Sequence, residues 1–397
     1  MENVSSSNGL EKYPKLRFPG FGEPWKTVRL SDVTSFRRQR AKSPKNAYVS
    51  TENLLQNFEG IVAYLDKDEV EGIAFMPGDT LLANIRPYLK KAWLASFEGI
   101  CSADVLAFSP EKITASFLYD IIARDCFIEY VMGGVKGSKM PRGDKAHILE
   151  YEFAIPEKSE QEKISAFIAS IDHRIKKQRE MIDVLKKYKR GFISEVLKQK
   201  LILSREGEKW EEVSLSDVAD GFEYGMNAAA TSFDGEHKYI RITDIDDDAH
   251  TYIASAPVSP SGDLEEKYRV RENDILFART GASVGKSYLY RKTDGDLFFA
   301  GFLIRIHVKE GVDSGYVFLN TLTEDYDKWV LLESARSGQP GINAEQYKRY
   351  SFKLPPLKIQ KQISGIAQKM DEQIKREYLC LRLLQKQRDG MLQQLFI

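Results

Sequence analysis

The chain has 397 residues, of which 58 are basic and 58 acidic, so its formal net charge is zero, and 42% of it is hydrophobic. This composition is typical of a water-soluble protein with two or three domains, and the polar N-terminus and lack of long apolar runs predict no signal peptide or membrane span. Three scattered cysteines and five histidines form no C-x-x-C or H-x-x-x-H pair, so we expect reduced thiols, a cytoplasmic location and no metal site. Zero net charge argues against a solitary DNA-binding protein but allows one that works within an assembly.

The first part of the chain is expected to be a tail, residues 1–24, followed by a globular domain, residues 25–157. Short β-rich runs alternate there with turn residues. Tyr48–Thr51 and Ile73–Phe75 are predicted strands, and Phe117–Ala123 is a predicted short helix. We therefore expect a domain of mixed helices and strands.

Two stretches are rich in basic residues. Ser35–Lys45 holds five basic residues and no acidic one, and Arg174–Lys200 holds ten against three acids. Charged runs most often form a solvated surface, and contact with DNA phosphates is the functional alternative. The candidate DNA-binding residues of the first run are Arg37, Arg38 and Arg40.

Long helices are predicted over residues 158–203 and 357–397, each preceded by proline where an extended segment ends. In both, apolar residues recur at alternating steps of four and three, which is the period of a coiled-coil seam. The polar interruptions fall at the same two steps, Gln178 and Lys189 in one helix and Glu377 and Arg388 in the other. Two unrelated amphipathic helices would not have polar interruptions at the same steps, so the two helices are copies of one repeat. The apolar seam residues are Ile164, Ile168, Ile171, Ile175, Ile182, Leu185, Phe192, Ile363, Met370, Ile374, Leu381, Leu384, Met391 and Leu395.

The second half of the chain repeats the first. Trp25–Val33 recurs as Trp210–Val218, and Gly78–Ala83 recurs as Asn273–Ala278. Because two copies of one module are expected to fold alike, residues 204–356 form a second predicted globular domain.

Within this second domain, Tyr239–Ile242 and Phe298–Ile306 are predicted strands and Tyr316–Leu322 is a predicted helix. The expected fold is α+β, with two mixed domains separated by two long helices that form an antiparallel coiled coil about an internal pseudo-two-fold axis. The apolar period runs over about 50 Å of helix. Such helices would hold the domains apart and inverted, about one turn of a DNA duplex from each other.

The run Phe277–Tyr290 looks like the phosphate-binding loop of an NTPase, but two features argue against that function. Only three residues separate Gly281 from Gly285, so the backbone nest is one residue too small. The residues after Lys286 read as a strand rather than as the start of a helix.

DNA recognition is the other functional interpretation of this run, and a β-hairpin turn with surface cations remains equally open. The corresponding run of the first half, Asn84–Leu94, shares a lysine at the same step but none of the glycines. Basic side chains there could reach phosphates or guanine, hydroxyls are adaptable donors, and Gly281 and Gly285 would let the backbone approach the duplex. The candidates are Lys90, Lys91, Arg279, Thr280, Ser283 and Lys286.

A second pair of candidate loops is Val135–Gly143 and, roughly opposite it, Ala335–Gly341. Lysine and arginine could neutralise phosphates, and arginine and glutamine suit guanine and adenine respectively. A solvent loop that joins a helix to the last strand is the equally open alternative. The candidate residues are Lys136, Lys139, Arg142, Arg336 and Gln339.

This layout resembles the specificity (S) subunit of type I restriction–modification systems over nearly the whole chain. The resemblance rests on the doubled arrangement, on the long helices and on a Pro-x(4)-Gln-x-x-Ile motif before each helix. The motif residues are Pro156, Gln161 and Ile164, then Pro355, Gln360 and Ile363. The glutamate usual before the glutamine is present as Glu160 but is replaced by Ile359 in the second copy.

The resemblance implies a non-catalytic subunit whose two target-recognition domains each read one half of a bipartite, asymmetric site in double-stranded DNA. It also implies that the helices set the spacing and dock two methyltransferase (M) subunits, with restriction/translocase (R) subunits joining later. S-adenosylmethionine and ATP would then bind to those partners, and we expect no cofactor in this chain. A coiled-coil adaptor without DNA readout is the alternative, and an NTPase is a more distant one.

Overall fold

The computed structural model describes residues 2–3, 13–62, 66, 68–137, 140–198, 209–253, 255–335 and 340–397. The chain divides into two compact units. Unit 1 comprises residues 1–179 and 379–397, and unit 2 comprises residues 180–378. Each unit therefore contains one globular part and a portion of both long helices.

Unit 1 contains short strands and short helices before its first long helix. The strands are β1 (Glu2–Asn3), β2 (Leu16–Arg17), β3 (Lys26–Arg29), β4 (Thr34–Phe36), β5 (Arg40–Pro44), β6 (Tyr48–Val49), β7 (Glu69–Phe75), β8 (Thr80–Ala83), β9 (Ala92–Leu94), β10 (Gly99–Cys101), β11 (Val105–Pro110) and β12 (Glu152–Ile155). The helices are α1 (Leu30–Val33), η1 (Lys45–Ala47), η2 (Pro87–Leu89), α2 (Ala115–Ile122), α3 (Asp125–Gly133) and α4 (Lys145–Leu149).

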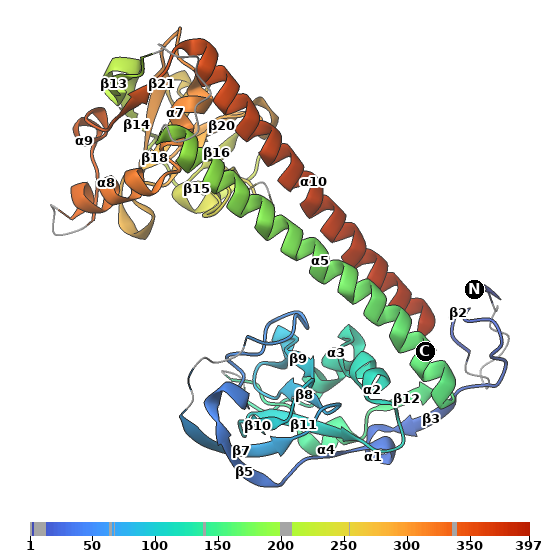
Figure 1. The fold of residues 1–397 in the computed structure, drawn as a ribbon. Coiled ribbons are helices and arrows are strands. Elements are labelled where there is room, and N and C mark those ends of the chain that lie inside the picture. The colour runs from blue at the N-terminus through green and yellow to red at the C-terminus, as the bar shows by residue number, and fades with distance from the viewer. Residues whose placement is uncertain are drawn as a thin grey trace. The chain divides into compact units, whose positions relative to one another are not determined.

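Two four-stranded sheets organise unit 1 (Figure 1). The antiparallel sheet has the order β4-β11-β8-β9, and the mixed sheet has the order β5-β7-β10-β6 with β6 parallel to β10. Strand β3 pairs with β12, which joins the start of the globular part to its end. The apolar residues of β8 and β11 alternate between two cores, so Leu82 and Phe108 pack with α2 while Leu81 and Val105 pack with Val49.

Unit 2 repeats this plan with longer connections. Its strands are β13 (Glu211–Ser214), β14 (Ala219–Tyr224), β15 (Ala230–Ser232), β16 (Lys238–Ile240), β17 (Val258–Pro260), β18 (Asp274–Ala278), β19 (Ser287–Leu289), β20 (Leu297–Phe299), β21 (Leu303–Val308) and β22 (Ser351–Leu354). Its short helices are α6 (Leu215–Val218), η3 (Ile242–Asp244), η4 (Glu266–Tyr268), η5 (Gly281–Ser283), η6 (Lys292–Asp294), α7 (Ser314–Asn320), α8 (Glu324–Ser334) and α9 (Ala344–Lys348).

The internal repeat predicted from the sequence is confirmed by sheet topology. The order β14-β21-β18-β19 of unit 2 corresponds strand by strand to β4-β11-β8-β9 of unit 1. The β13–β22 pair corresponds to the β3–β12 pair, and the parallel β16–β20 pair to β6–β10. The expected α+β class is therefore correct for both units.

Three predicted strands have different bounds in the structure. Tyr48–Thr51 is a strand only at its first two residues, and Tyr239–Ile242 leads into η3. The run Phe298–Ile306 is wrong as one strand, because β20 ends at Phe299, the chain turns at residues 300–302, and β21 begins at Leu303 in a different sheet. An apolar run alone does not reveal such a change of sheet.

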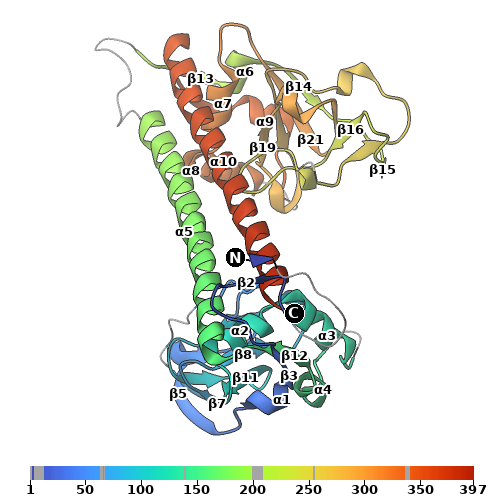
Figure 2. The same ribbon diagram turned by 90° about the vertical axis from the view of Figure 1, so that its right-hand side faces the viewer.

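The two long helices are α5 (Lys158–Leu197) and α10 (Leu357–Leu395), and they lie side by side in both views (Figures 1 and 2). In unit 1, Ile164 and Ile168 of α5 share a core with Leu392 and Leu395 of α10, so the helices are antiparallel there. In unit 2, Val196 packs in one core with Ile363 and Ala367. All fourteen apolar seam residues are buried or half-buried.

The glutamine of the repeated motif ties each long helix to its globular part. In unit 1, Gln161 Oε1 accepts a hydrogen bond from Thr114 N at 2.9 Å, and its Nε2 donates to Pro156 O at 2.9 Å. In unit 2, Gln360 makes the corresponding bonds with Asp313 N at 2.9 Å and Pro355 O at 2.7 Å. Both glutamines are buried, so the motif satisfies backbone groups that water cannot reach.

The departure from the motif at Ile359 also has a structural reason. Glu160 is buried and accepts two hydrogen bonds, each 2.8 Å long, from the guanidinium of Arg17. Ile359 is instead buried in the apolar core of unit 2. A buried carboxylate needs a partner, whereas an isoleucine is stable without one.

Candidate nucleic-acid interface

In unit 1 the two candidate loops meet. One connects β8 to β9 and contains η2, and the other runs from α3 to α4. Arg86 N donates to Pro141 O at 2.9 Å, Ile85 forms an isolated β-bridge with Arg142, and Gly143 N donates to Asn84 O at 3.2 Å. Residues 84–91 therefore form one surface with residues 135–137 and 140–143, and we call these segments the paired loops of unit 1.

Unit 2 brings its two candidate loops together in the same way. Gly281 N donates to Pro340 O at 3.3 Å, and Ile342 N donates to Arg279 O at 2.9 Å. Thr280 forms an isolated bridge with Gly341. The paired loops of unit 2 are residues 279–286 with residues 335 and 340–342. Lys139, Arg336 and Gln339, which are also candidates, lie outside the described residues.

The paired loops of unit 1 present several basic side chains to solvent. Lys136 and Arg142 are exposed, and they form ion pairs with Asp144 and Asp104 respectively. Lys90 is half-buried and pairs with Asp125 at 2.8 Å. Surface pairs of this kind are weak, so the cations remain available to a phosphate that competes for them.

In unit 2, Arg279 is half-buried, with its guanidinium 4.7 Å from the centre of the Tyr224 ring. No ion pair joins Arg279 to an acidic residue in the described part of the chain. Thr280 and Ser283 lie beside it and are half-buried. Arg279 therefore stacks on Tyr224, and no acidic residue among those described neutralises its charge.

The lysines at the shared step have a different environment. Lys91 Nζ donates to Thr51 O at 2.7 Å, and Lys286 Nζ donates to Ile245 O at 3.0 Å. Lys286 also pairs with Asp247, and its side chain is only 11% exposed. In both units this lysine ties its hairpin to an upstream segment, so its ammonium group is engaged within its own unit.

The two glycines of the unit 2 hairpin also differ. Both have positive φ angles, 77° at Gly281 and 88° at Gly285. A Cβ at Gly281 would meet none of the described residues within 4 Å, whereas one at Gly285 would lie 2.6 Å from the side chain of Val330. Gly281 therefore leaves the backbone open to a ligand, and Gly285 serves to pack the hairpin on α8.

The strand expected after Lys286 is present as β19, which pairs antiparallel with β18. A phosphate-binding loop needs a helix N-terminus at that position, because the helix amides bind the phosphate. The hairpin thus lacks the architecture that its glycine–lysine–serine run superficially suggests.

The basic residues of the β4–β5 segment lie apart from the paired loops. Arg37 donates two hydrogen bonds, at 2.9 and 3.1 Å, to the buried carboxylate of Asp79, which precedes β8, whereas the paired loops follow that strand. Arg40 pairs with Glu71 at 3.0 Å on the exposed side of β5, and Arg38 is exposed.

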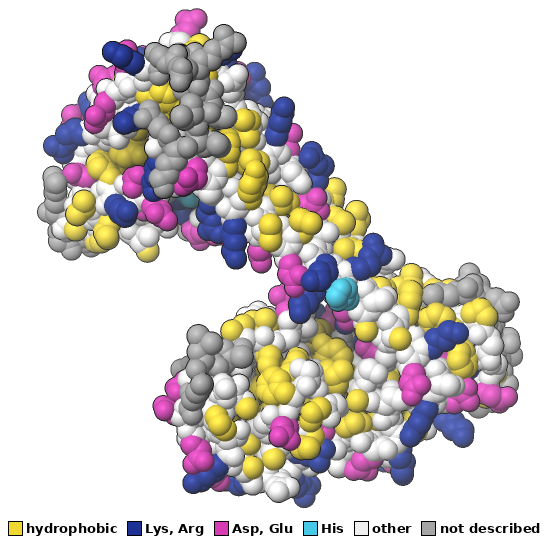
Figure 3. Space-filling view, in the orientation of Figure 1, with side chains coloured by type: hydrophobic (Ala, Val, Ile, Leu, Met, Phe, Trp, Pro, Cys, Tyr) yellow, Lys and Arg dark blue, Asp and Glu magenta, His cyan; other side chains and the backbone are white. Residues whose placement is uncertain are grey.

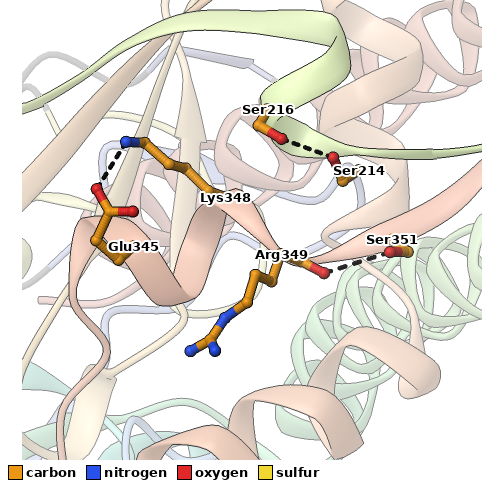
Figure 4. A pocket seen from close by; sticks show the side chains of 6 residues that line it. All are labelled: Ser214, Ser216, Glu345, Lys348, Arg349 and Ser351. Atoms are coloured by element: carbon orange, nitrogen blue, oxygen red, sulfur yellow. Dashed lines mark hydrogen bonds and ion pairs between the residues drawn. The ribbon is translucent and has the colours of Figure 1, made fainter.

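A cleft beside the paired loops of unit 2 extends the basic surface. Its lining includes Arg279, Thr280, Gln346 and Arg349. Arg349 also lines a second hollow with Lys348 and Ser351 (Figure 4), and its guanidinium lies 3.9 Å from the carboxylate of Glu333. Both hollows are shallow, and one glutamate lines each of them beside the basic residues, Glu333 in the first and Glu345 in the second. Such open hollows suit an extended ligand better than an enclosed small molecule.

Several residues of these surfaces were missed by sequence reasoning. They are Arg86, Tyr88, Tyr224, Phe302 and Arg349. Arg86 and Tyr88 belong to the run Asn84–Leu94 identified from the sequence, but no sequence pattern marks a single exposed side chain as a binding residue. The other three reach the surface only through the tertiary fold.

In the described part of the chain, no three metal-ligating side chains gather into a site. Among those same residues, none of the helices is both long and apolar enough to span a bilayer.

The family model described as type I restriction modification DNA specificity domain matches residues 22–187 and 207–379. The type I restriction enzyme EcoDI specificity subunit of Escherichia coli is 23% identical over 168 residues, which are 40% of this chain and 37% of that protein. The chain thus aligns with less than half of that relative's length.

Two solved structures share the fold over almost the entire chain. The S subunit of a type I restriction–modification system from M. genitalium superposes with a TM-score of 0.59 at 13% identity, covering 97% of this chain and 99% of that one. A chain from a structural study of assembly and conformational transition in a type I system gives 0.58 at 16% identity, covering 96% and 98%. At such identities the likeness is one of fold.

Proposed function

The chain belongs to the family of type I restriction modification DNA specificity domains, of which it carries two, and we propose that it selects the DNA sequence on which a type I restriction–modification complex acts. Each unit would read one half of a bipartite, asymmetric site through its paired loops. Exposed basic residues would hold the phosphates, and the loop side chains would contact the base edges.

One observation carries this proposal. The paired loops are built from the same two segments in both units and joined by corresponding backbone contacts, yet their side chains differ. Asp104 and Arg142 face each other in unit 1, while unit 2 has Phe302 in the corresponding region and an Arg279 for which the described residues supply no acidic partner. A shared scaffold with different chemistry is what two readers of different half-sites require.

The long helices would set the gap between the half-sites and carry the M subunits. Apolar side chains remain exposed on them, among basic ones (Figure 3). Val184 on α5 and Leu383 on α10 stand at the same step of the repeated helix, with 60% and 58% of their surface exposed. Two equivalent apolar positions suit two copies of one partner, and R subunits would join the resulting complex.

The chain itself would be non-catalytic and would act in the cytoplasm. S-adenosylmethionine and ATP would bind to the M and R subunits. The antiparallel β18–β19 hairpin supports this division, because it lacks the helix that a nucleotide phosphate site needs.

Methylation sequencing of DNA from cells that express the chain with its M subunit tests the proposal. We expect one split, asymmetric motif methylated on both strands. An assembled complex that methylates without any sequence preference would contradict the proposal and favour a coiled-coil adaptor. ATP binding to the isolated chain, lost on Lys286→Ala, would instead support the NTPase alternative.

A further inference from the structure

Phe302 is a large apolar side chain that unit 2 leaves exposed. It occupies the turn between β20 and β21, and 64% of its surface is accessible. Its neighbours Phe298 and Phe299 are buried, as are Leu303 and Ile304 on the other side. The turn therefore places one aromatic ring outside an otherwise apolar run.

The exposure of Phe302 is fixed by the backbone around it. Leu303 N donates to Ala300 O at 2.8 Å, which closes the turn, and Gly301 N donates to Met226 O at 2.8 Å. Phe302 O accepts from Arg279 N at 3.0 Å, which ties the turn to the paired loops. These bonds fix the backbone from which the ring projects, so less backbone entropy is lost when the turn binds a ligand.

The backbone at Gly225 also packs closely against the β20–β21 turn. A Cβ at Gly225 would lie 2.3 Å from Ala300 O, so no other residue fits there. Gly225 follows Tyr224, whose ring lies against the guanidinium of Arg279. Tyr224, Arg279 and Phe302 thus belong to three segments that are joined at one edge of unit 2.

The corresponding turn of unit 1 has the same backbone contact and a different side chain. Asp104 O accepts from Asn84 N at 2.8 Å, as Phe302 O does from Arg279 N. The Asp104 carboxylate, however, pairs with Arg142 at 3.1 Å. The position is therefore a fixed point of the scaffold at which one unit carries a charge and the other an aromatic ring.

We propose that Phe302 reads a thymine in the half-site of unit 2 by packing against its C5-methyl group. This inference rests on the function proposed above and adds a residue and a base to it. The thymine methyl is the apolar group that the major groove offers to a phenyl ring, and cytosine, guanine and adenine offer polar edges there. Arg279 beside it would hold a phosphate or a guanine.

The loss of one buried methyl contact corresponds to about a three- to fivefold change in affinity. The test uses the complex assembled with M subunits and duplexes that carry its recognised motif. Each thymine of the unit 2 half-site is replaced in turn by deoxyuridine, which lacks only the methyl group. Binding is measured for the wild type, for Phe302→Ala, and for Phe233→Ala, a control at a phenylalanine of unit 2 that is 37% exposed.

At one position we expect deoxyuridine to weaken wild-type and Phe233→Ala binding three- to fivefold and to leave Phe302→Ala binding unchanged. Equal sensitivity in the wild type and Phe302→Ala, or no sensitive thymine, would overturn the inference while leaving the proposed function intact. A wild-type complex that shows no sequence preference would instead overturn the proposed function, and the inference with it.

Discussion

Asp172 on α5 accepts hydrogen bonds from the guanidinium of Arg388 on α10, at 2.5 and 3.4 Å, within unit 1. In unit 2 the same contact recurs with the helices exchanged, as Lys189 on α5 donates to Asp371 on α10 at 2.6 Å. Lys189 and Arg388 occupy equivalent positions of the two helices, at one of the two steps where a polar residue interrupts both apolar seams. At this interruption, each basic residue therefore pairs with an aspartate of the other helix, which fixes the register of an antiparallel seam.

Removal of either aspartate should destabilise its unit. Asp172→Ala leaves Arg388, whose side chain is mostly buried, without its partner, and we expect a loss of about 1–3 kcal/mol in the free energy of unfolding. Denaturant unfolding measures this. The control is Glu71→Ala, which removes the exposed pair with Arg40 and should cost less than about 0.5 kcal/mol. Equal losses in both variants would contradict a role in holding the helices.

The glutamine of the repeated motif should matter for the same reason. Gln360→Ala removes the partners of Asp313 N and Pro355 O, so we expect about 1–3 kcal/mol less stability and faster amide exchange at the start of α7. Gln368→Ala is the matched control, because that glutamine is exposed on the same helix. If Gln360→Ala were as stable as Gln368→Ala, the two hydrogen bonds of Gln360 would have no stabilising role.

Burial raises the pKa of Asp120 from its ordinary value of 3.8 to about 7, although a hydrogen bond from Ser165 opposes the shift. The folded state thus binds this proton more tightly than the unfolded state, and the stability of unit 1 should fall as pH rises from about 4 to 7. Asp120→Asn removes this dependence.

The advantage of Asp120→Asn over the wild type should therefore grow by about 1–4 kcal/mol between pH 4 and pH 8. Thermal or denaturant unfolding at both pH values measures it. Asp389→Asn, at an exposed position of α10, controls for the general effect of losing a carboxylate. A constant difference between Asp120→Asn and wild type across this range would show that the carboxyl does not titrate there.

Exposed apolar residues on the long helices should govern assembly. Val184→Glu and Leu383→Glu each place a charge at one of two equivalent positions, so we expect each variant to bind one M subunit where the wild type binds two. Native mass spectrometry of the complex counts the subunits. Gln387→Glu, also exposed on α10, should retain both. Full occupancy in the Val184 and Leu383 variants would place the docking surface elsewhere.

The repeat and the long helices could be predicted because their signals are local and periodic. The seam residues follow a fixed step, and the Pro-x(4)-Gln motif stands beside each helix in the sequence. What the motif does was not visible, since Gln161 bonds to Thr114 and Gln360 to Asp313, residues that are distant in the sequence.

The candidate interface was only partly predictable, because it depends on contacts between distant segments. The sequence indicated each of the four loops separately. Their pairing within each unit depends on backbone contacts such as that of Arg86 with Pro141. Lys286 looked available as a cation, and the fold engages it with Ile245 O. Phe302 was hidden in an apparently continuous strand, since nothing in an apolar run marks where the chain changes sheet.

In the proposed function, each unit reads its own half-site through its paired loops. Methylation sequencing of cells that express Arg279→Ala or Arg86→Ala with the M subunit tests it most directly. We predict that Arg279→Ala relaxes only one half of the split motif and Arg86→Ala only the other, with the gap unchanged. Variants that relax the same half, or that leave both halves as in the wild type, would contradict the account.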